Sequence, residues 1–458
     1  MRKKQKTIFI TVGRAFIVKS ILRSGTLEHL KKSGHKIVIF LFDLRGRELP
    51  EYIRREFEDE NVTIEVAKHF KASPIHRRFR IFSSLLVYNV QNRKFRYLSG
   101  KGGKLPFAVE KVIFSLLGSI GFLKTLARFV ERTLFKTDAY SVYFDKYNPS
   151  VVFSTSIISS IEVEFLKEAK KRKIKTIAMA RGWDNVTTKF YKIIPDRFLV
   201  QNKFMKKDAI RLQKFKPEII KVCGFPQFDW HLRKDIIMPR EEYFKLIGLD
   251  PAKKLILWGS TGAWMPHDVN VCDFLVKAVE NDKTFSKPTS LLIRSHPFDA
   301  IERRFDHFLG RSNTAVDNNF SFSDFFLDQS DDGINEIKEF VNMMYHTDIV
   351  IVQASTLAFN ALTFNKPVIN TVFKGVLDTK GRDITPLLYE VDCYKPVIDL
   401  NVVDTVYSEE ELIKSINHYL ENPEYKSKER KDALEELCHK VDGNVSKRIA
   451  DEVLSLIE

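Results

Sequence analysis

The stretch IVIVQASTLAFNALTFNKPV, residues 349–368, passes from four apolar residues through a small polar turn into a helix-forming segment that ends at Asn-Lys-Pro. Such a short apolar run is typical of a buried strand in a parallel sheet. Ser355 and Thr356 can begin the helix, where unpaired backbone N–H groups favour an anion. The stretch therefore predicts a strand–turn–helix unit that binds a negative charge; a capped helix without a ligand is the alternative.

The same order of apolar runs and helix-forming segments recurs in both halves of the chain. We expect an α/β protein with two Rossmann-like domains, residues 1–235 and 236–458, whose parallel sheets face a central cleft. The polar segment at about 230–250 marks the boundary between the two domains. The last helix, at about 441–458, is expected to pack back on the first domain. The predicted strands are 7–12, 36–42, 151–155, 175–180, 197–201, 219–224, 254–260, 290–297, 348–355 and 366–373.

Composition limits the class of protein. The chain has 458 residues and 44% apolar content, enough for two cores. Its four cysteines stand far apart without a CxxC pair, which indicates a reducing, cytoplasmic compartment rather than a disulfide framework or a zinc site. No run reaches the roughly 20 apolar residues that span a bilayer.

The net charge of +15 is concentrated in residues 71–136, which hold fourteen Lys or Arg and two acids. In the helix-forming part of this insertion, 121–136, the basic residues Lys124, Arg128, Arg132 and Lys136 share one side and apolar residues share the other. We expect residues of about 107–136 to lie in an anionic membrane surface, with the basic residues at the head groups. An ordinary core-packed helix is the alternative. Nucleic acid is not expected as a partner, because the apolar side is large and no binding motif accompanies it.

Three predicted strand ends in the second half carry polar groups that would meet at one sheet edge. The first strand ends in Gly259-Ser260-Thr261, the second in Arg294 and His296, and the third in Ser355 and Thr356. Ligands of parallel α/β sheets bind beyond the carboxyl ends of the strands. Convergence of these groups predicts a site for a diphosphate, in which Arg294 and His296 neutralise the leaving group.

The first half has its own cluster, where strand 175–180 runs into ARGWDNVTTK, residues 180–189. Trp183 offers a stacking face, and Asp184 is the expected acceptor of a proton from an attacking hydroxyl. Asn185 and Lys189 supply donors. The alternative is a structural turn with a packed Trp183.

Three segments together resemble GT-B type glycosyltransferases, and more narrowly the group of CDP-glycerol glycerophosphotransferases and capsular or surface-polysaccharide transferases. They are IRSHP (293–297), HTDIVIVQASTLAFNALTFNKPVI (346–369) and the stretch from ARGWDNVTTK to VCGFP (180–226). The resemblance implies that the second domain holds the nucleotide donor and the first the acceptor. One departure concerns the phosphate-binding helix, where relatives carry an acid and this chain has Asn360.

The resemblance implies direct transfer with neither a cofactor nor a divalent metal. The expected function is transfer of a sugar from a nucleotide-sugar to a membrane-associated glycan or lipid-linked acceptor, at the inner face of the cell membrane. A CDP-glycerol-type polyol-phosphate transferase is one alternative. A nucleotide-sugar epimerase or a non-catalytic nucleotide-binding relative is the other.

Overall fold

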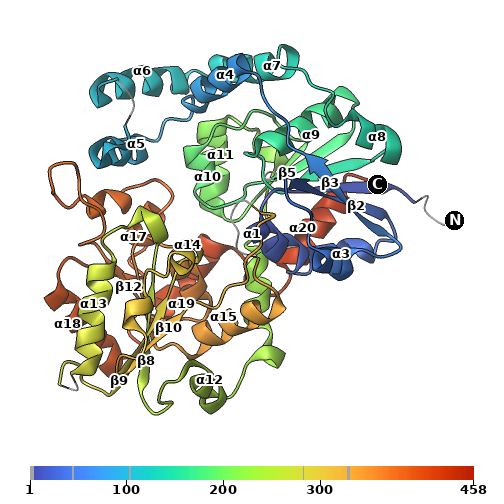
Figure 1. Ribbon diagram of the computed structural model, residues 1–458. Coiled ribbons are helices and arrows are strands. Elements are labelled where there is room, and N and C mark those ends of the chain that lie inside the picture. Colours follow the sequence, from blue (N-terminus) through green and yellow to red (C-terminus); the bar gives the residue numbers. More distant parts are fainter. Residues whose placement is uncertain (1–4, 44–45, 103–104, 282, 327–330, 458) are drawn as a thin grey trace.

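The structure is a computed structural model that describes residues 5–43, 46–102, 105–281, 283–326 and 331–457. It has two lobes, each built on one parallel sheet with helices packed around it (Figure 1). The strands of the first lobe lie within residues 1–235 and those of the second within 236–458. The functional assignment of these two ranges as acceptor and donor domains stays a prediction.

The sheet of the first lobe has the order β3-β2-β1-β4-β5-β6-β7, and all its strands are parallel. The strand order reverses between β1 and β4, which is where such sheets bind ligands. The strands are β1 (Thr7–Val12), β2 (Lys36–Asp43), β3 (Val62–Lys68), β4 (Val151–Ser154), β5 (Lys175–Met179), β6 (Arg197–Val200) and β7 (Ile220–Val222).

The helices of the first lobe connect these strands and form an added layer after β3. They are α1 (Ala15–Ile17), a π-helix (Val18–Leu22), α2 (Thr26–Lys31), α3 (Glu51–Phe57), α4 (Pro74–Ser84), α5 (Val90–Arg96), a second π-helix (Tyr97–Lys101), α6 (Phe107–Ser119), α7 (Gly121–Thr133), α8 (Ser141–Tyr147), α9 (Ser160–Lys171), α10 (Asn185–Thr188) and α11 (Lys203–Gln213). The segment after β1 breaks at Gly25, whose φ of 110° lies in the left-handed region that glycine tolerates.

The sheet of the second lobe is also parallel and follows the order β10-β9-β8-β11-β12-β13, with its reversal between β8 and β11. The strands are β8 (Lys254–Gly259), β9 (Thr289–Arg294), β10 (Thr314–Asp317), β11 (Ile349–Val352), β12 (Val368–Thr371) and β13 (Asp404–Val406). The α-helices are α12 (Arg240–Ile247), α13 (Val269–Glu280), α14 (Pro297–Ile301), α15 (Ile334–His346), α16 (Leu357–Thr363), α17 (Lys395–Asp399), α18 (Glu409–Glu421), α19 (Ser427–Cys438) and α20 (Val445–Leu454). Short 3-10 helices lie at Pro217–Ile219, Pro226–Leu232, Lys234–Ile236, Gly262–Trp264, Asp306–Phe308 and Thr385–Leu388.

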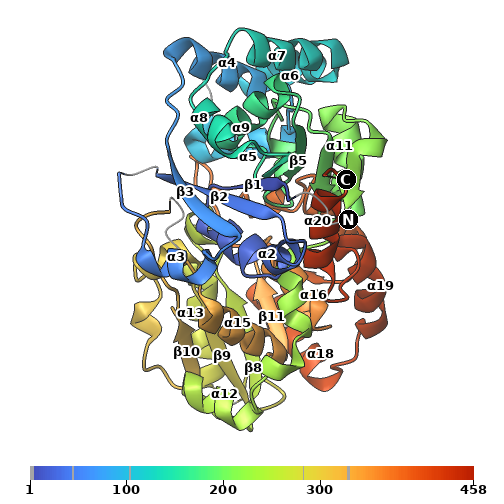
Figure 2. The same cartoon turned by 90° about the vertical axis from the view of Figure 1, so that its right-hand side faces the viewer.

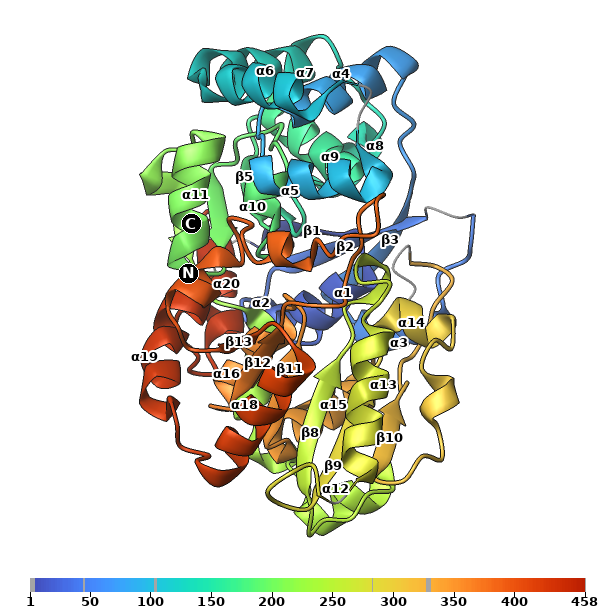
Figure 3. The same cartoon turned by 90° about the vertical axis from the view of Figure 1, so that its left-hand side faces the viewer.

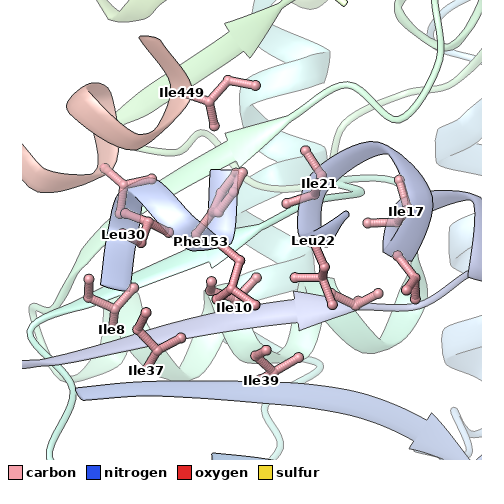
Figure 4. Packing of buried hydrophobic residues seen from close by; sticks show 14 of the residues in the cluster. Ile8, Ile10, Ile17, Ile21, Leu22, Leu30, Ile37, Ile39, Phe153 and Ile449 are labelled. Carbon is pink, nitrogen blue, oxygen red and sulfur yellow. The ribbon is translucent and has the colours of Figure 1, made fainter. Parts of the chain in front are cut away.

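The last helix, α20, packs on the first lobe, against α2. Figure 4 shows Ile449 of α20 above a cluster that includes Ile8 and Ile10 of β1 and Leu30 of α2. Removing these aliphatic side chains from water favours the contact by roughly 1.5–3 kcal/mol for each fully buried residue. Helix α20 therefore belongs by its packing to the lobe that contains β1.

Two further contacts join the lobes. Phe325 and Phe326, which follow β10 of the second lobe, are buried in the same cluster as β1 and β2 of the first. In the other direction, Phe95 of α5 is buried among residues of the second lobe, including Met265 and Val376. Each lobe thus completes part of the other's core, which holds the facing sheet edges in place.

Helices α4, α6 and α7 form a layer at the end of the first lobe that lies away from the second (Figure 2 and Figure 3). Among the described residues, no single helix is long and apolar enough to span a membrane; α6 and α7 pass that test only together, as a pair bent by 82°. A buried network ties the layer to α9: Arg80 lies 2.5 Å from both Glu131 and Glu164, and Lys167 lies 2.8 Å from Glu164.

The predicted orientation of α7 is wrong. Lys124 and Arg128 face the protein: the Lys124 ammonium donates to the carbonyl of Leu212 at 2.7 Å, and Arg128 donates to the carbonyls of Tyr191 and Gln213. Burial lowers the pKa of Lys124 to about 8. The Arg128 guanidinium also lies over the rings of Phe190 and Phe215, so the protein itself supplies the partners of both cations.

The apolar side of the layer is consequently exposed. Phe122 is 70% and Leu116 is 62% exposed, and both lie among other large apolar side chains on the same layer. The exposed apolar residues are Ile75, Ile81, Phe82, Leu105, Val109, Val112, Ile113, Leu116, Ile120, Phe122, Leu126, Phe129 and Leu134, which we call the outer apolar face. Exposed patches of this kind mark interaction sites in soluble proteins.

Candidate active site

A cavity of about 530 Å³ lies between the lobes, where the carboxyl ends of both sheets face each other. Its first-lobe wall comes from the turns after β1, β4 and β5, and its second-lobe wall from the turns after β8, β9 and β11. The two points at which strand order reverses, β1/β4 and β8/β11, therefore open into one space.

His296 lies on the second-lobe wall at the start of α14. Its Nδ1 accepts a hydrogen bond from the N–H of Phe298 at 3.3 Å, so the proton of the neutral ring is assigned to Nε2. Burial lowers the pKa of His296 and favours this neutral form. Gly262 passes beneath the ring, where an added Cβ would come within 2.9 Å of the His296 Cγ. The arrangement leaves Nε2–H as a donor.

Arg294, which lies beside His296, is already paired. Its guanidinium contacts Asp317 at 2.5 Å, and its Cζ lies 4.1 Å from the centre of the Phe320 ring. The carboxylate balances the positive charge, and the ring fixes the plane of the side chain. Arg294 is thus a rigid part of the wall rather than an uncommitted cation.

The turn after β11 presents backbone donors to the cavity. Ala354 has a φ of 45°, and its N–H donates to the hydroxyl of Tyr389 at 3.1 Å. Within the described ranges, the next two N–H groups, of Ser355 and Thr356, have no acceptor. The Ser355 hydroxyl accepts from the N–H of Leu357 at 3.3 Å, while Asn360 donates to the carbonyl of Thr356. The hydroxyl therefore stabilises the turn, and the backbone supplies the free donors.

The turn after β8 is held mainly by internal contacts. Ser260 donates to Asp299 at 2.5 Å, and the hydroxyl of Thr261 donates to the carbonyl of Gln353. Burial raises the pKa of the neighbouring Asp268 to about 6. Gly259 packs so closely on Leu357 that an added Cβ would lie 2.4 Å from its Cδ2. These contacts fix the β8 and β11 turns side by side.

Asp184 lies on the first-lobe wall, in the turn between β5 and α10. Asn185 donates to its Oδ1 at 2.9 Å and accepts from the N–H of Gly182 at 3.1 Å, which fixes the direction of the carboxylate. Burial raises the pKa of Asp184 above its ordinary value. A carboxylate with a raised pKa and a fixed direction suits the acceptance of a proton.

Trp183 reaches across to the second lobe. Its ring meets Phe359 edge-on at 5.0 Å between centres and Tyr394 at 5.6 Å. The predicted stacking residue is thus also an interlobe packing residue, with part of its surface on the cavity.

The structure brings most of the predicted site residues into one cavity. The predicted residues that line the cavity are Trp183, Asp184, Gly259, Ser260, Arg294, His296, Ser355, Thr356 and Asn360. Three predicted residues do not: Thr261 and Asn185 are used in the turns, and Lys189 is exposed outside the lining. The sequence indicated these three residues by their polarity alone. In the structure, Thr261 and Asn185 form hydrogen bonds near their own turns, and Lys189 lies at the end of α10.

Several lining residues were not predicted. Arg181 stands in the quoted turn without an assigned role, and Lys19 lies in a helical segment that gave no signal. His231 lines the cavity and donates to or accepts from the Thr363 hydroxyl at 2.7 Å, and burial lowers its pKa to about 3. Of these, only Arg181 had a sequence signal, because it directly follows a strand end.

Solved structures with the same architecture extend over nearly the whole chain. MnaA of S. aureus in a co-structure with UDP has a TM-score of 0.54 at 11% identity, covering 99% of this chain and 98% of that one. UDP-GlcNAc 2-epimerase from Neisseria meningitidis bound to UDP-GlcNAc has 0.56 at 12%, covering 98% and 100%. A variant of the wall teichoic acid polymerase TagF has 0.53 at 12%, covering 99% and 89%. The predicted GT-B fold is confirmed.

The family follows from the sequence of the second lobe and the end of the first. Residues 191–455 match the family model described as CDP-Glycerol:Poly(glycerophosphate) glycerophosphotransferase, which is more than half of the chain. The chain belongs to this family, and the predicted resemblance is confirmed, as is the prediction of a transferase at this general level. A comparison with curated proteins finds no matching sequence.

Proposed function

We propose that the protein transfers a polyol phosphate from a CDP-activated donor to a hydroxyl of a growing surface polymer. Family membership supports the donor class. The observation that carries the proposal is that one cavity brings free donors of the second lobe together with the Asp184 carboxylate of the first. This is the arrangement that in-line transfer needs, with a base on one side and a phosphate site on the other.

In the proposed reaction, the acceptor oxygen attacks the phosphorus that carries the polyol. Asp184 takes the hydroxyl proton, a new P–O bond forms, and the bond to the CMP oxygen breaks. The N–H groups of Ser355 and Thr356, with Nε2–H of His296, stabilise the charge that develops on the departing phosphate. We propose that these donors act without a cofactor or a divalent metal, so that turnover persists in EDTA.

A sugar donor is the second candidate. The first-lobe turn with Trp183 and Asp184 lies before residue 191 and therefore outside the family match. In that case, attack falls on the anomeric carbon of a nucleotide-sugar, and a nucleoside diphosphate leaves instead of CMP. An epimerase or a binding-only relative is the third, because two of the similar structures bear UDP or UDP-GlcNAc.

Product analysis separates these candidates. The protein is incubated with CDP-glycerol or with UDP-sugars, with and without a polyol-phosphate or glycan acceptor, and released nucleotides are separated by chromatography. We expect acceptor-dependent CMP. Acceptor-dependent UDP establishes the sugar candidate, and conversion of the free nucleotide-sugar without an acceptor establishes the epimerase. Nucleotide binding without any turnover overturns both transfer reactions and the epimerase, and establishes the binding-only relative.

We also propose that the outer apolar face rests in the inner surface of the cell membrane and holds the enzyme beside a membrane-associated acceptor. The exposure of the large apolar side chains on one layer supports this, together with the exposed cations Arg132 and Lys136 at and just after the end of α7. Apolar side chains enter the acyl boundary while nearby cations meet anionic head groups. This keeps the predicted segment, 107–136, and replaces the predicted contact of Lys124 and Arg128.

A further inference from the structure

Arg181 lines the cavity directly after β5, on the same turn as Asp184. It is half-buried. Within the part of the chain that the structure describes, no hydrogen bond or ion pair reaches its guanidinium. A charged group that is partly removed from water without a partner costs free energy, so its presence in a cavity calls for a ligand.

The other cationic side chains of the cavity are balanced. Arg294 pairs with Asp317, and Lys19 pairs with Asp332 at 2.8 Å. Each contributes shape and rigidity but little net charge to a ligand. Among the described lysines and arginines of the lining, Arg181 is the exception.

The charge of Arg181 lowers the pKa of two carboxyl groups, but both accept hydrogen bonds from other residues. The Arg181 charge opposes the upward pKa shift of Asp184, whose Oδ1 accepts from Asn185. It has the same effect on Glu162, which is fully buried and has a pKa of about 7 because of that burial. One oxygen of Glu162 accepts from the hydroxyls of Thr11 and Ser154 and from a backbone N–H. Neither carboxylate forms an ion pair with the guanidinium.

We propose that Arg181 binds a phosphate group of the acceptor, next to the hydroxyl that attacks the donor. This rests on the proposed transfer reaction. The donor phosphates belong to the opposite wall, where Ser355, Thr356 and His296 supply the hydrogen-bond donors. An anion held by Arg181 therefore lies on the side of Asp184, where the acceptor enters. A guanidinium presents two parallel N–H groups to a phosphate, which positions the acceptor as well as attracting it.

The proposal specifies the chemistry of the acceptor. It carries a phosphate within a few bonds of its nucleophilic hydroxyl, as at the end of a polyol-phosphate chain or in a glycan linked to a prenyl diphosphate. A neutral glycan end offers Arg181 nothing. Arg181 would recognise a polyol-phosphate chain end and a prenyl diphosphate in the same way. The test below distinguishes them by using one acceptor of each kind.

Steady-state kinetics with Arg181→Gln and Arg181→Lys test the proposal. The acceptors are glycerol 3-phosphate, a prenyl-diphosphate-linked glycan and unphosphorylated glycerol. For Arg181→Gln we expect the KM of a phosphorylated acceptor to rise about 10- to 100-fold, with partial recovery in Arg181→Lys and no change for glycerol or for the donor. The phosphorylated acceptor that shows the larger rise identifies the source.

Lys175→Gln is the matched control, because it removes one positive charge from the exposed, opposite end of the same strand. It should leave every KM unchanged. An equal loss with glycerol, or a rise in donor KM instead of acceptor KM, overturns the assignment of Arg181 to the acceptor. Matching thermal unfolding of the variants and the wild type shows that the fold is kept.

Binding measured without turnover distinguishes failure of this inference from failure of the proposed function. Titration of glycerol 3-phosphate into wild type and Arg181→Gln, followed by NMR in the absence of donor, should show a 10- to 100-fold weaker interaction in the variant. Equal binding by both proteins, or no binding by the wild type, overturns the inference. Absence of turnover with every nucleotide donor overturns the proposed function and leaves this binding result to stand by itself.

Discussion

The two walls of the cavity differ in how far their polar groups are already committed. On the second-lobe wall, Arg294 is paired, Ser260 is bound to Asp299, and the ring of His296 is fixed from below by Gly262. On the first-lobe wall, Arg181 has no partner among the described residues, and burial keeps the pKa of Asp184 raised. The side chains of the second-lobe wall are thus held by internal contacts, and its free donors are backbone N–H groups, whereas the first-lobe wall carries a cation without a partner among the described residues.

This difference parallels the family match. Residues 191–455 include the second-lobe wall, while the turn with Arg181 and Asp184 lies before them. The outer apolar face also lies in the unmatched part. In the proposed function, the donor phosphates therefore bind to the part of the chain that matches the family, and the acceptor binds beside the part that does not.

Asp184→Asn should have the largest effect of the changes to either wall. Loss of the base should lower kcat by roughly 10²–10⁴-fold with little change in nucleotide affinity. Because burial raises the pKa of Asp184, wild-type activity should fall as pH drops through that raised pKa, above the usual range of an aspartate. The residual activity of the variant should lack this limb.

The control for this change is stability. Burial disfavours the charged Asp184, so the neutral amide should not lower the unfolding temperature at pH 7, where the wild-type carboxylate carries the cost of its desolvation. The Asn185 hydrogen bond can still form to the amide oxygen. A variant as active as the wild type removes Asp184 from the mechanism; a variant that unfolds early would require the loss to be remeasured at lower temperature.

Arg128→Ala tests the corrected orientation of α7. The wild-type guanidinium donates to the carbonyls of Tyr191 and Gln213 inside the first lobe. Leaving these acceptors unpaired should cost about 2–3 kcal/mol of unfolding free energy, measured by urea denaturation. Arg132→Ala, an exposed residue one turn further along the same helix, should change it by less than about 0.5 kcal/mol. Equal stability of both variants would restore the orientation predicted from the sequence.

The helix wheel of residues 121–136 explains why the orientation of α7 predicted from the sequence is wrong. It separates basic from apolar residues correctly but does not say which side faces the protein. Buried carbonyls from residues far along the chain, at 191, 212 and 213, decide that. The parallel sheets, by contrast, follow from local apolar runs, and so the three strand ends that carry Gly259, Arg294 and Ser355 could be placed at one edge.

Other differences have similar causes. Strands β3, β10 and β13 were not predicted. All three are edge strands: β3 carries polar residues between its apolar ones, and β10 and β13 have only four and three residues. The helical segment after β1 is interrupted at Gly25, whose left-handed φ an apolar pattern does not reveal. The sequence shows that Arg181 follows a strand. It does not show that Asp317 pairs with Arg294 and Asp332 with Lys19, which leaves Arg181 as the cation of the lining without a partner among the described residues.

Phe122→Ser with Leu116→Ser tests the membrane part of the comparison between lobes. Each side chain is mostly exposed on the outer apolar face and should contribute about 1–2 kcal/mol to insertion into vesicles of mixed phosphatidylcholine and phosphatidylglycerol. Sedimentation with vesicles should show a loss in affinity of about tenfold or more. Leu246→Ser, an exposed leucine on α12 of the second lobe, is the control and should bind as the wild type does. Wild type that never sediments with vesicles refutes the membrane proposal.

Ser355→Ala with Thr356→Ala should have the smallest effect, because the second-lobe wall uses backbone N–H groups there rather than hydroxyls. The Ser355 hydroxyl accepts from Leu357 and only stabilises the turn. The double variant should therefore bind CMP or CDP, in calorimetry, within about 1 kcal/mol of the wild type. Thr356→Pro removes one N–H at a φ of −62° that proline adopts, and should weaken binding by about 1.5–3 kcal/mol. If the double variant loses more affinity than Thr356→Pro, the hydroxyls bind the donor, and the second-lobe wall acts through side chains rather than backbone N–H groups.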